Sequence, residues 1–133
     1  MQLDKASCYA LFATVCIAQQ AVDRPVQGRT VATWCDLPFE YLLKILQQLA
    51  RSGILISERG RTGGFRLARS ANEITLLEII EAIQGPVRPR LLGPRKGHLT
   101  RPEQLIDRLC TEIADHARVR LARMTVSDLS RGA

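Results

Sequence analysis

Apolar residues recur along the chain in patterns that predict a mainly α-helical protein with one small β-hairpin. Residues 4–20 are apolar on most faces, which predicts a helix buried in a core or between subunits. A short helix is expected over residues 30–35, and a second one over residues 38–52, with Asp36 and Pro38 at its start. The second helix has apolar positions at i, i+3, i+4 and i+7, which form one buried stripe: Leu42, Ile45, Leu46 and Leu49.

Two short segments after this helix have the pattern of paired strands. Residues 54–57 are apolar and largely β-branched, and residues 65–69 alternate apolar and basic side chains. The segment between them, ERGRTGG, contains glycines that can adopt positive φ and therefore predicts a hairpin tip. Gly53 is expected to be the left-handed cap of the preceding helix. Helix, tight turn, helix and two-stranded hairpin are the order of a winged helix-turn-helix.

The second half of the chain predicts a helix, a linker and a longer helix. Thr75 and Glu78 have the spacing of a capping box, and the helix that they start is expected to stop at Gly85. Residues 86–102 contain four prolines, two glycines and five basic residues but no acidic one, which is typical of a loop. From residue 102 to 124 one apolar stripe recurs at helical spacing.

This last helix is amphipathic and has no other predicted element to cover it. A second copy of the same helix is the simplest partner, so we expect a homodimer. The chain then divides into a winged helix-turn-helix domain over residues 1–85, a basic linker over 86–101, and a dimerisation helix with a C-terminal turn over 102–133. The first helix of the winged domain is also expected to pack at the dimer. The expected interface residues are Leu105, Leu109, Ile113, Ala117 and Leu121.

Composition narrows the class of function. The formal net charge of +6 favours an anionic partner such as nucleic acid. The N-terminal segment has neither a positively charged start nor a cleavage site, so we expect a cytoplasmic protein without a membrane partner. No glycine-rich phosphate loop, metal-ligand spacing or nucleophile–base pair is recognisable in the sequence, so we expect that the protein is not an enzyme.

Charged and polar side chains gather where a winged helix would use them on DNA. A helix in the major groove reads bases with its outward face, and an arginine on a thin hairpin can enter a minor groove. A solvated helix face is the alternative interpretation for single positions, but an arginine-rich tip is hard to explain by solubility alone. The candidate DNA-contacting residues are Glu40, Tyr41, Lys44, Gln48, Arg51, Arg59, Arg61 and Arg66, with Arg69 as a further phosphate ligand.

The run PFEYLLKILQQLARSGILISERGRTGGFRLARSANEITLLEIIEAI resembles the Rrf-two family of bacterial winged-helix regulators, which includes the IscR, NsrR and CymR types. It has the tyrosine–leucine pair of the recognition helix at Tyr41, the Arg–Gly–x–x–Gly–Gly–aromatic–x–Leu wing from Arg59, and the Ile–Thr–Leu helix start at Ile74. The resemblance implies a dimeric, sequence-specific DNA-binding regulator, which we expect to be a repressor. Residues 38–52 would lie in the major groove and the wing, 54–69, at the minor groove.

The resemblance also raises the question of a sensor. Cluster-binding members of this family carry three cysteines in the loop before the long helix, and residues 86–102 contain none. We therefore expect no metal and no cofactor. The alternative is an atypical iron–sulfur site built from Cys110, His98 and Asp107.

Two cysteines are candidate redox thiols, and the alternative is that no cysteine senses a signal and that a ligand or a partner protein regulates the protein. Cys35 lies at the junction between the two helices of the recognition motif, and Cys110 lies in the expected dimer helix. Asp36 is expected to raise the pKa of its neighbour Cys35 if it has any effect. The competing class of function is a winged-helix docking module that binds another protein and not DNA, which salt-dependent duplex binding would distinguish.

Overall fold

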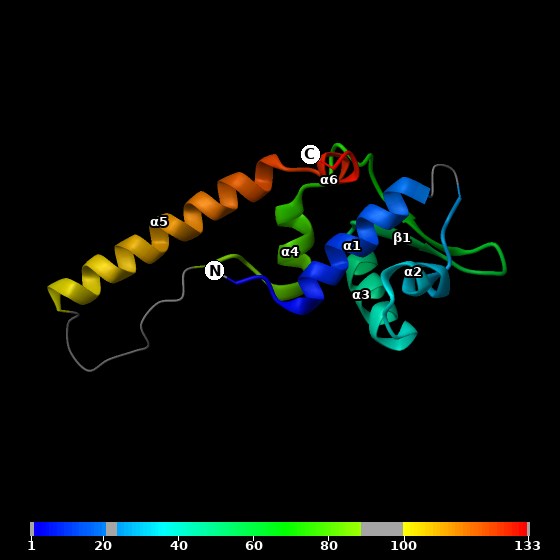
Figure 1. Ribbon diagram of the computed structural model, residues 1–133, viewed down its shortest axis with the longest axis horizontal. Coiled ribbons are helices and arrows are strands. Elements are labelled where there is room, and N and C mark those ends of the chain that lie inside the picture. The colour runs from blue at the N-terminus through cyan, green and yellow to red at the C-terminus, as the bar shows by residue number, and fades with distance from the viewer. Residues whose placement is uncertain (1, 21–23, 89–99, 133) are drawn as a thin grey trace.

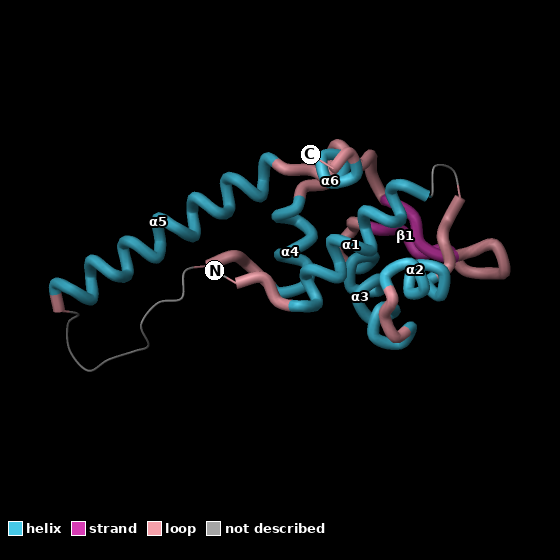
Figure 2. The backbone as a smooth tube through the Cα atoms, viewed as in Figure 1, coloured by secondary structure: helices cyan, strands magenta, loops and turns pink. Residues whose placement is uncertain are grey.

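The computed structural model describes residues 2–20, 24–88 and 100–132. These residues form a winged domain from which one long helix extends (Figures 1 and 2). The order of elements confirms the mainly α fold with a small two-stranded sheet. The elements are α1 (Lys5–Gln20), α2 (Gly28–Cys35), α3 (Phe39–Arg51), β1 (Leu55–Glu58), β2 (Gly64–Leu67), α4 (Leu76–Gln84), α5 (Arg101–Arg123) and α6 (Val126–Ser130).

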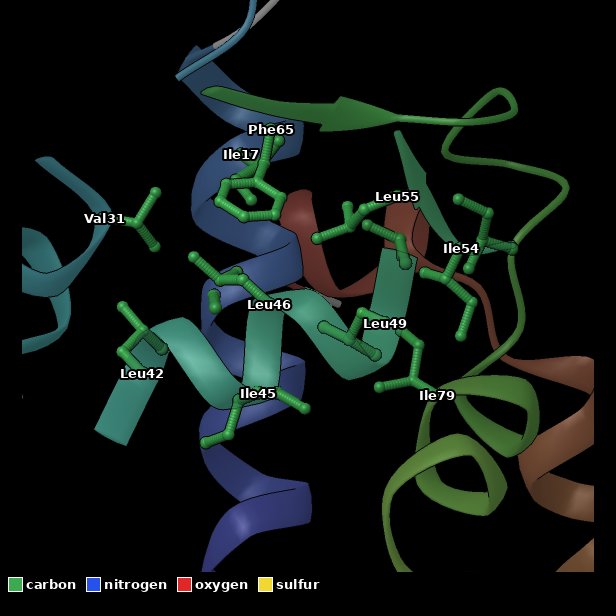
Figure 3. Close-up of a cluster of buried hydrophobic side chains, with 14 of the residues drawn as sticks. Ile17, Val31, Leu42, Ile45, Leu46, Leu49, Ile54, Leu55, Phe65 and Ile79 are labelled. Carbon is green, nitrogen blue, oxygen red and sulfur yellow. The ribbon is translucent and has the colours of Figure 1, made fainter. Parts of the chain in front are cut away.

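The hydrophobic core lies between α1, α3 and the hairpin (Figure 3). The α3 stripe predicted from the sequence is buried, and it packs with Ile17 of α1, Phe65 of β2 and Ile79 of α4. Burying a large aliphatic side chain stabilises a fold by about 1.5–3 kcal/mol, so this stripe fixes α3 against the domain. The opposite face of α3 is consequently left toward solvent.

The turn between α2 and α3 differs from the sequence prediction. Asp36 does not start α3; it adopts a left-handed conformation (φ 53°) and ends α2. Its backbone N–H donates to the carbonyl of Thr33 at 3.3 Å. Pro38 immediately precedes α3 in an extended conformation, and Phe39 is the first helical residue. An aspartate tolerates the left-handed region better than most residues, which explains why it can close the shorter helix.

The hairpin is shifted slightly from the predicted ranges 54–57 and 65–69. Its antiparallel register pairs Leu55 with Leu67 and Glu58 with Gly64. Val26 lies along the outer side of β2, where its N–H and carbonyl each form a 2.8 Å hydrogen bond with Phe65. The wing is therefore tied to the chain segment that leads into α2.

Gly53 confirms the predicted left-handed helix cap. It has φ 79°, and its N–H donates to the carbonyl of Ala50 at 3.1 Å. The following residue, Ile54, donates to the carbonyl of Leu49 at 3.0 Å. These two bonds satisfy the last carbonyls of α3 and direct the chain into β1.

Capping boxes start the three C-terminal helices. The predicted box is confirmed, because the Thr75 side chain accepts from the Glu78 N–H while the Glu78 carboxylate accepts from the Thr75 N–H. Thr100 with Glu103 starts α5 in the same way, a signature present in the sequence but not used in the prediction. The α5 helix spans 101–123 where the sequence predicted 102–124. Most of the predicted linker, residues 89–99, lies outside the described residues.

The end of α5 is attached to the start of α4. The N–H of Leu76 donates to the carbonyl of Met124, and the N–H of Val126 donates to the carbonyl of Ile74, both at 2.9 Å. From this attachment α5 runs away from the winged domain (Figure 1). In the part of the chain that the structure describes, no helix is long and apolar enough to cross a membrane.

Candidate nucleic-acid interface

The outward face of α3 presents polar side chains to solvent. Glu40 lies in the first turn, Lys44 and Gln47 follow on the same face, and Arg51 lies in the last turn; all four are exposed. Their positions at i, i+4, i+7 and i+11 follow directly from the burial of the stripe on the other side. This face has the hydrogen-bonding groups that a major-groove reading helix requires.

Tyr41 is held at the edge of this face. Its ring meets the ring of Tyr9 edge-on, with centroids 6.0 Å apart and an interplanar angle of 88°. The residue is nevertheless 38% exposed. An edge-on aromatic pair contributes about 0.5–1.5 kcal/mol, so the contact with α1 favours this position of the Tyr41 ring.

Gln48 does not lie on the outward face as the sequence suggested. Its side-chain nitrogen donates to the carbonyl of Ala82 in α4 at 3.2 Å, and its side-chain oxygen accepts from Arg51 at 3.0 Å. Both ends of the amide are therefore engaged within the chain. Gln47, one position earlier, is the exposed glutamine of α3.

The tip of the wing carries two exposed arginines, Arg59 and Arg61. Gly60 lies between them with φ 105°, a conformation that glycine adopts without a steric cost. The backbone of the tip is also anchored, because the side chain of Gln27 donates to the carbonyl of Arg61 at 3.1 Å. Across residues 2–20, 24–88 and 100–132, neither arginine takes part in an ion pair.

The two arginines at the base of the wing have partners within the chain. Arg66 pairs with Glu58 across the hairpin at 2.7 Å, and Arg69 pairs with Glu78 of α4 at 2.8 Å. All four side chains are about two-fifths exposed. Pairs exposed to this extent contribute only about 0–1 kcal/mol, so a phosphate group can compete for either arginine.

Arg29 is a cation that the sequence analysis did not include. It lies in the first turn of α2, and its guanidinium carbon is 4.2 Å from the ring centre of Phe39, the first residue of α3. Such a contact over an aromatic face holds the charge at the start of the two helices. The residues are ten positions apart on different helices, so only the packing of α2 against α3 reveals the pair.

The apolar stripe predicted along α5 divides into an exposed and a packed part. Leu105, Leu109 and Ile113 are between 51% and 56% exposed, whereas Ala117 is half-buried. Leu121 packs within the chain against a small cluster formed by Leu76, Ile80 and Val87. Two further apolar side chains on α5 are about half exposed: Ile106 and Val119.

An ion pair fixes the C-terminal half of α5 to α4. Arg118 approaches the carboxylate of Glu81 at 2.8 Å and the carbonyl of Val87 at 3.3 Å. The same carboxylate accepts from the N–H of Val87 at 2.8 Å. These bonds join α4, the start of the linker and α5, and leave the N-terminal half of α5 without a covering element among the described residues.

The four cysteines are half-buried. In residues 2–20, 24–88 and 100–132, no group of three histidine, cysteine or acidic side chains is arranged to hold a metal ion. Of the three residues of the alternative cluster site, Cys110 and Asp107 lie on α5, and His98 lies outside the described residues. One buried oxygen of Asp107 has no hydrogen-bond partner among the described residues. Iron–sulfur clusters require several thiolates, so the described residues do not fit one.

Comparison with known proteins finds transcriptional regulators in each case. A family described as "Rrf2: Iron-dependent Transcriptional regulator" matches residues 3–132. The HTH-type transcriptional regulator IscR of Cereibacter sphaeroides is 31% identical over 134 residues, covering 97% of this chain and 86% of its own length. The regulator BadM of Rhodopseudomonas palustris, named as putative, is 35% identical over 80 residues, but the match spans only 51% of its length.

Solved structures share the fold. The structure of CymR, the global cysteine regulator of B. subtilis, matches 100% of this chain and 98% of its own, with a TM-score of 0.81 and 23% identity. The structure of T. potens IscR matches 99% of this chain and 88% of its own, with a TM-score of 0.73 and 22% identity.

Proposed function

Because this chain belongs to the Rrf2 family of DNA-binding transcriptional regulators, we propose that it binds a partly palindromic operator as a homodimer and acts as a repressor. The outward face of α3 enters the major groove and the wing tip reaches an adjacent minor groove. Repression follows most simply from occupancy, since a bound dimer excludes other proteins from the same DNA. The site of action is the bacterial cytoplasm, where the DNA lies.

This proposal rests mainly on one observation: two arginines without an ion-pair partner within the described ranges lie at the anchored tip of the wing, in the same domain as the polar outward face of α3. Arg59 and Arg61 have no acidic partner among the described residues, so their charge is available to phosphates or to a narrow groove. The residues of α3 that contact bases are Glu40, Tyr41 and Lys44, together with Gln47 in place of Gln48, which the sequence had suggested. Arg51, Arg66 and Arg69 are phosphate ligands, and Arg29 joins them at the start of α2.

The dimer forms through the exposed part of the α5 stripe. Leu105, Leu109 and Ile113 expose apolar surface along one side of a helix that leaves its own domain. The same surface on a second copy is self-complementary about a two-fold axis. Ala117 lies at the end of this contact, and Leu121 supports it from within its own chain.

The test is operator selection from random duplexes, followed by affinity measurements over a range of salt concentrations and sedimentation of the free protein. We expect a dimer and two half-sites about one helical turn apart. An affinity that is absent at low salt would favour the protein-docking alternative. A monomer in solution, or a single half-site in the selected duplexes, would contradict the dimer.

Arginine substitutions separate the two modes of contact. Arg59→Ala should weaken binding most at sites with A·T steps under the tip, because a narrow minor groove attracts the guanidinium. Arg66→Ala should weaken all sequences alike and lower the salt slope by about one. Arg131→Ala, which removes an equal charge from the C-terminal end, is the matched control. Identical behaviour of the first two variants across an A·T substitution series would contradict the division of roles.

A further inference from the structure

Two cysteines from different helices line one apolar hollow on the winged domain. Cys16 lies in the last turns of α1, and Cys35 is the last residue of α2. The hollow has a volume of about 430 Å³, and apolar side chains form the rest of its wall. Its lining residues are Phe12, Val15, Cys16, Trp34, Cys35 and Leu129.

The two thiols interact directly. The pKa of the Cys35 thiol is raised to about 11, first by burial, then by the charge of Cys16 and by a hydrogen bond between the two side chains. The sequence pointed to Asp36 as the neighbour that would raise this pKa, whereas the structure identifies Cys16. Since the hydrogen bond raises the pKa of Cys35, the Cys35 thiol donates and the Cys16 sulfur accepts. The pair is therefore asymmetric, because Cys35 stays a thiol and donates its proton to the other sulfur.

The hollow is accessible to small solutes. Two of its lining side chains are exposed, Phe12 at 59% and Trp34 at 42%. Cys16 and Cys35 are themselves partly exposed. We therefore expect a small oxidant to reach the sulfurs without any rearrangement of the buried core.

We propose that Cys16 and Cys35 form an intramolecular disulfide when a hydroperoxide enters this hollow. The Cys16 thiol loses its proton to solvent, and its sulfur attacks one oxygen of the O–O bond, which breaks; the sulfur becomes a sulfenic acid, and the leaving oxygen takes up a proton from solvent and departs as an alcohol, or as water from hydrogen peroxide. The Cys35 sulfur then attacks the Cys16 sulfur, loses its proton and displaces water. Two thiols are thus oxidised by two electrons and one peroxide is reduced.

The disulfide changes the position of α2 relative to α1. Bonded sulfurs lie about 2.0 Å apart, closer than any non-bonded contact, and we expect the end of α2 to move toward α1 when they join. Cys35 directly precedes Asp36, the left-handed residue that turns the chain into α3. A shift at this turn re-aims the outward face of α3. The consequence for DNA rests on the proposed function; the disulfide itself does not.

The experiment uses the full chain with Cys8→Ser and Cys110→Ser, so that only the proposed pair can react. Hydrogen peroxide is added, and the protein is then alkylated and digested with trypsin. Cleavage after Lys5, Arg29 and Lys44 should yield residues 6–29 and 30–44. We expect these two peptides to be joined and lighter by two hydrogen atoms than their sum, and dithiothreitol to separate them. Separate peptides after oxidation, or a link between two molecules in an isotope-mixed sample, would overturn the proposal.

Trp34 provides a second readout in solution. It is the only tryptophan in the chain and it lines the same hollow. Its fluorescence should fall as the link forms, at the rate at which the joined peptide appears, and Cys16→Ser or Cys35→Ser should abolish this change. Fluorescence that falls equally in those variants would contradict disulfide formation at this site.

DNA affinity is measured on the same samples. Oxidation should weaken operator binding by about tenfold, the loss expected when one base contact is misplaced, and reduction should restore it. The single variants Cys16→Ser and Cys35→Ser should bind equally before and after peroxide. A joined peptide with unchanged affinity would refute the effect on α3. A reduced protein that binds no duplex would refute the proposed function, while the joined peptide would still support the disulfide.

Discussion

Substitution of Gly64 by alanine should destabilise the protein more than the same substitution at Gly60, the glycine between the two arginines of the wing tip. Gly64 is the first residue of β2 and has φ 148°, a conformation that side-chain-bearing residues rarely adopt. A Cβ atom at this position would lie 2.3 Å from the carbonyl oxygen of Val26 and 2.8 Å from the backbone nitrogen of Gln27. Both neighbours are backbone atoms, so no side chain can rotate away to relieve the overlap.

The size of the effect follows from what must move. The segment at Val26 has to retreat from β2, and this breaks its two 2.8 Å hydrogen bonds with Phe65. Each bond contributes about 0.5–1.5 kcal/mol. The unfavourable backbone conformation costs about 1–3 kcal/mol in addition. We therefore expect Gly64→Ala to lower the free energy of unfolding by about 4 kcal/mol, which is a large part of the roughly 5–15 kcal/mol that stabilises a typical domain.

Gly60→Ala is the matched control. Gly60 also has positive φ, 105°, but a Cβ atom there would meet nothing within 4 Å. Only the backbone term applies, so the expected loss is about 2 kcal/mol.

Urea unfolding followed by circular dichroism measures both variants. With a slope of about 2 kcal/mol/M, the midpoint should fall by about 2 M for Gly64→Ala and about 1 M for Gly60→Ala. Protein concentration must be equal in all samples, because the stability of a dimer depends on it. Equal midpoints for the two variants would show that the Val26 segment moves without cost and would refute the reasoning.

Three further predictions concern the helices. Burial raises the pKa of Glu78, but hydrogen bonds from the helix cap and from an arginine lower it by more, so the net shift is downward. The stability that the Glu78 carboxylate contributes is therefore present above about pH 4.5 and is lost as the pH falls through the folded pKa. Glu78→Gln should therefore lower the free energy of unfolding by about 0.3–1 kcal/mol at pH 7. The variant should also lose less stability than the parent between about pH 5 and about pH 3, which urea midpoints across this range would check. Arg118→Met should lower the free energy of unfolding by about 1 kcal/mol, because it removes the ion pair with Glu81 of α4. Arg120→Met, at an exposed position of the same helix, should change it very little in the same assay. Leu109→Glu should convert the dimer to a monomer in sedimentation, and Thr111→Glu on another face of α5 should not; a dimer in both would contradict the assigned interface.

Much of the fold could be predicted because its signals are local. The buried stripe of α3, the capping box at Thr75 and the cap at Gly53 each involve residues within one or two helical turns, so the chain itself shows their spacing. The glycines of ERGRTGG likewise predicted the hairpin tip, because a tight turn depends on the φ values of its own residues. Asp36 was assigned to the wrong helix, since its short side chain suits both a helix start and a left-handed stop.

The candidate site divides in the same way. The sequence alone determined which charged residues α3 and the wing offer, because helical and strand periodicity decide which side chains can share a face. Only the tertiary structure decided which of them are free: Gln48 is occupied by α4, whereas Arg59 and Arg61 are unpaired in the described part of the chain. It also decided that Cys16 meets Cys35, although nineteen positions separate them. Contacts of this kind depend on how distant helices pack, and no pattern of neighbouring residues encodes that packing.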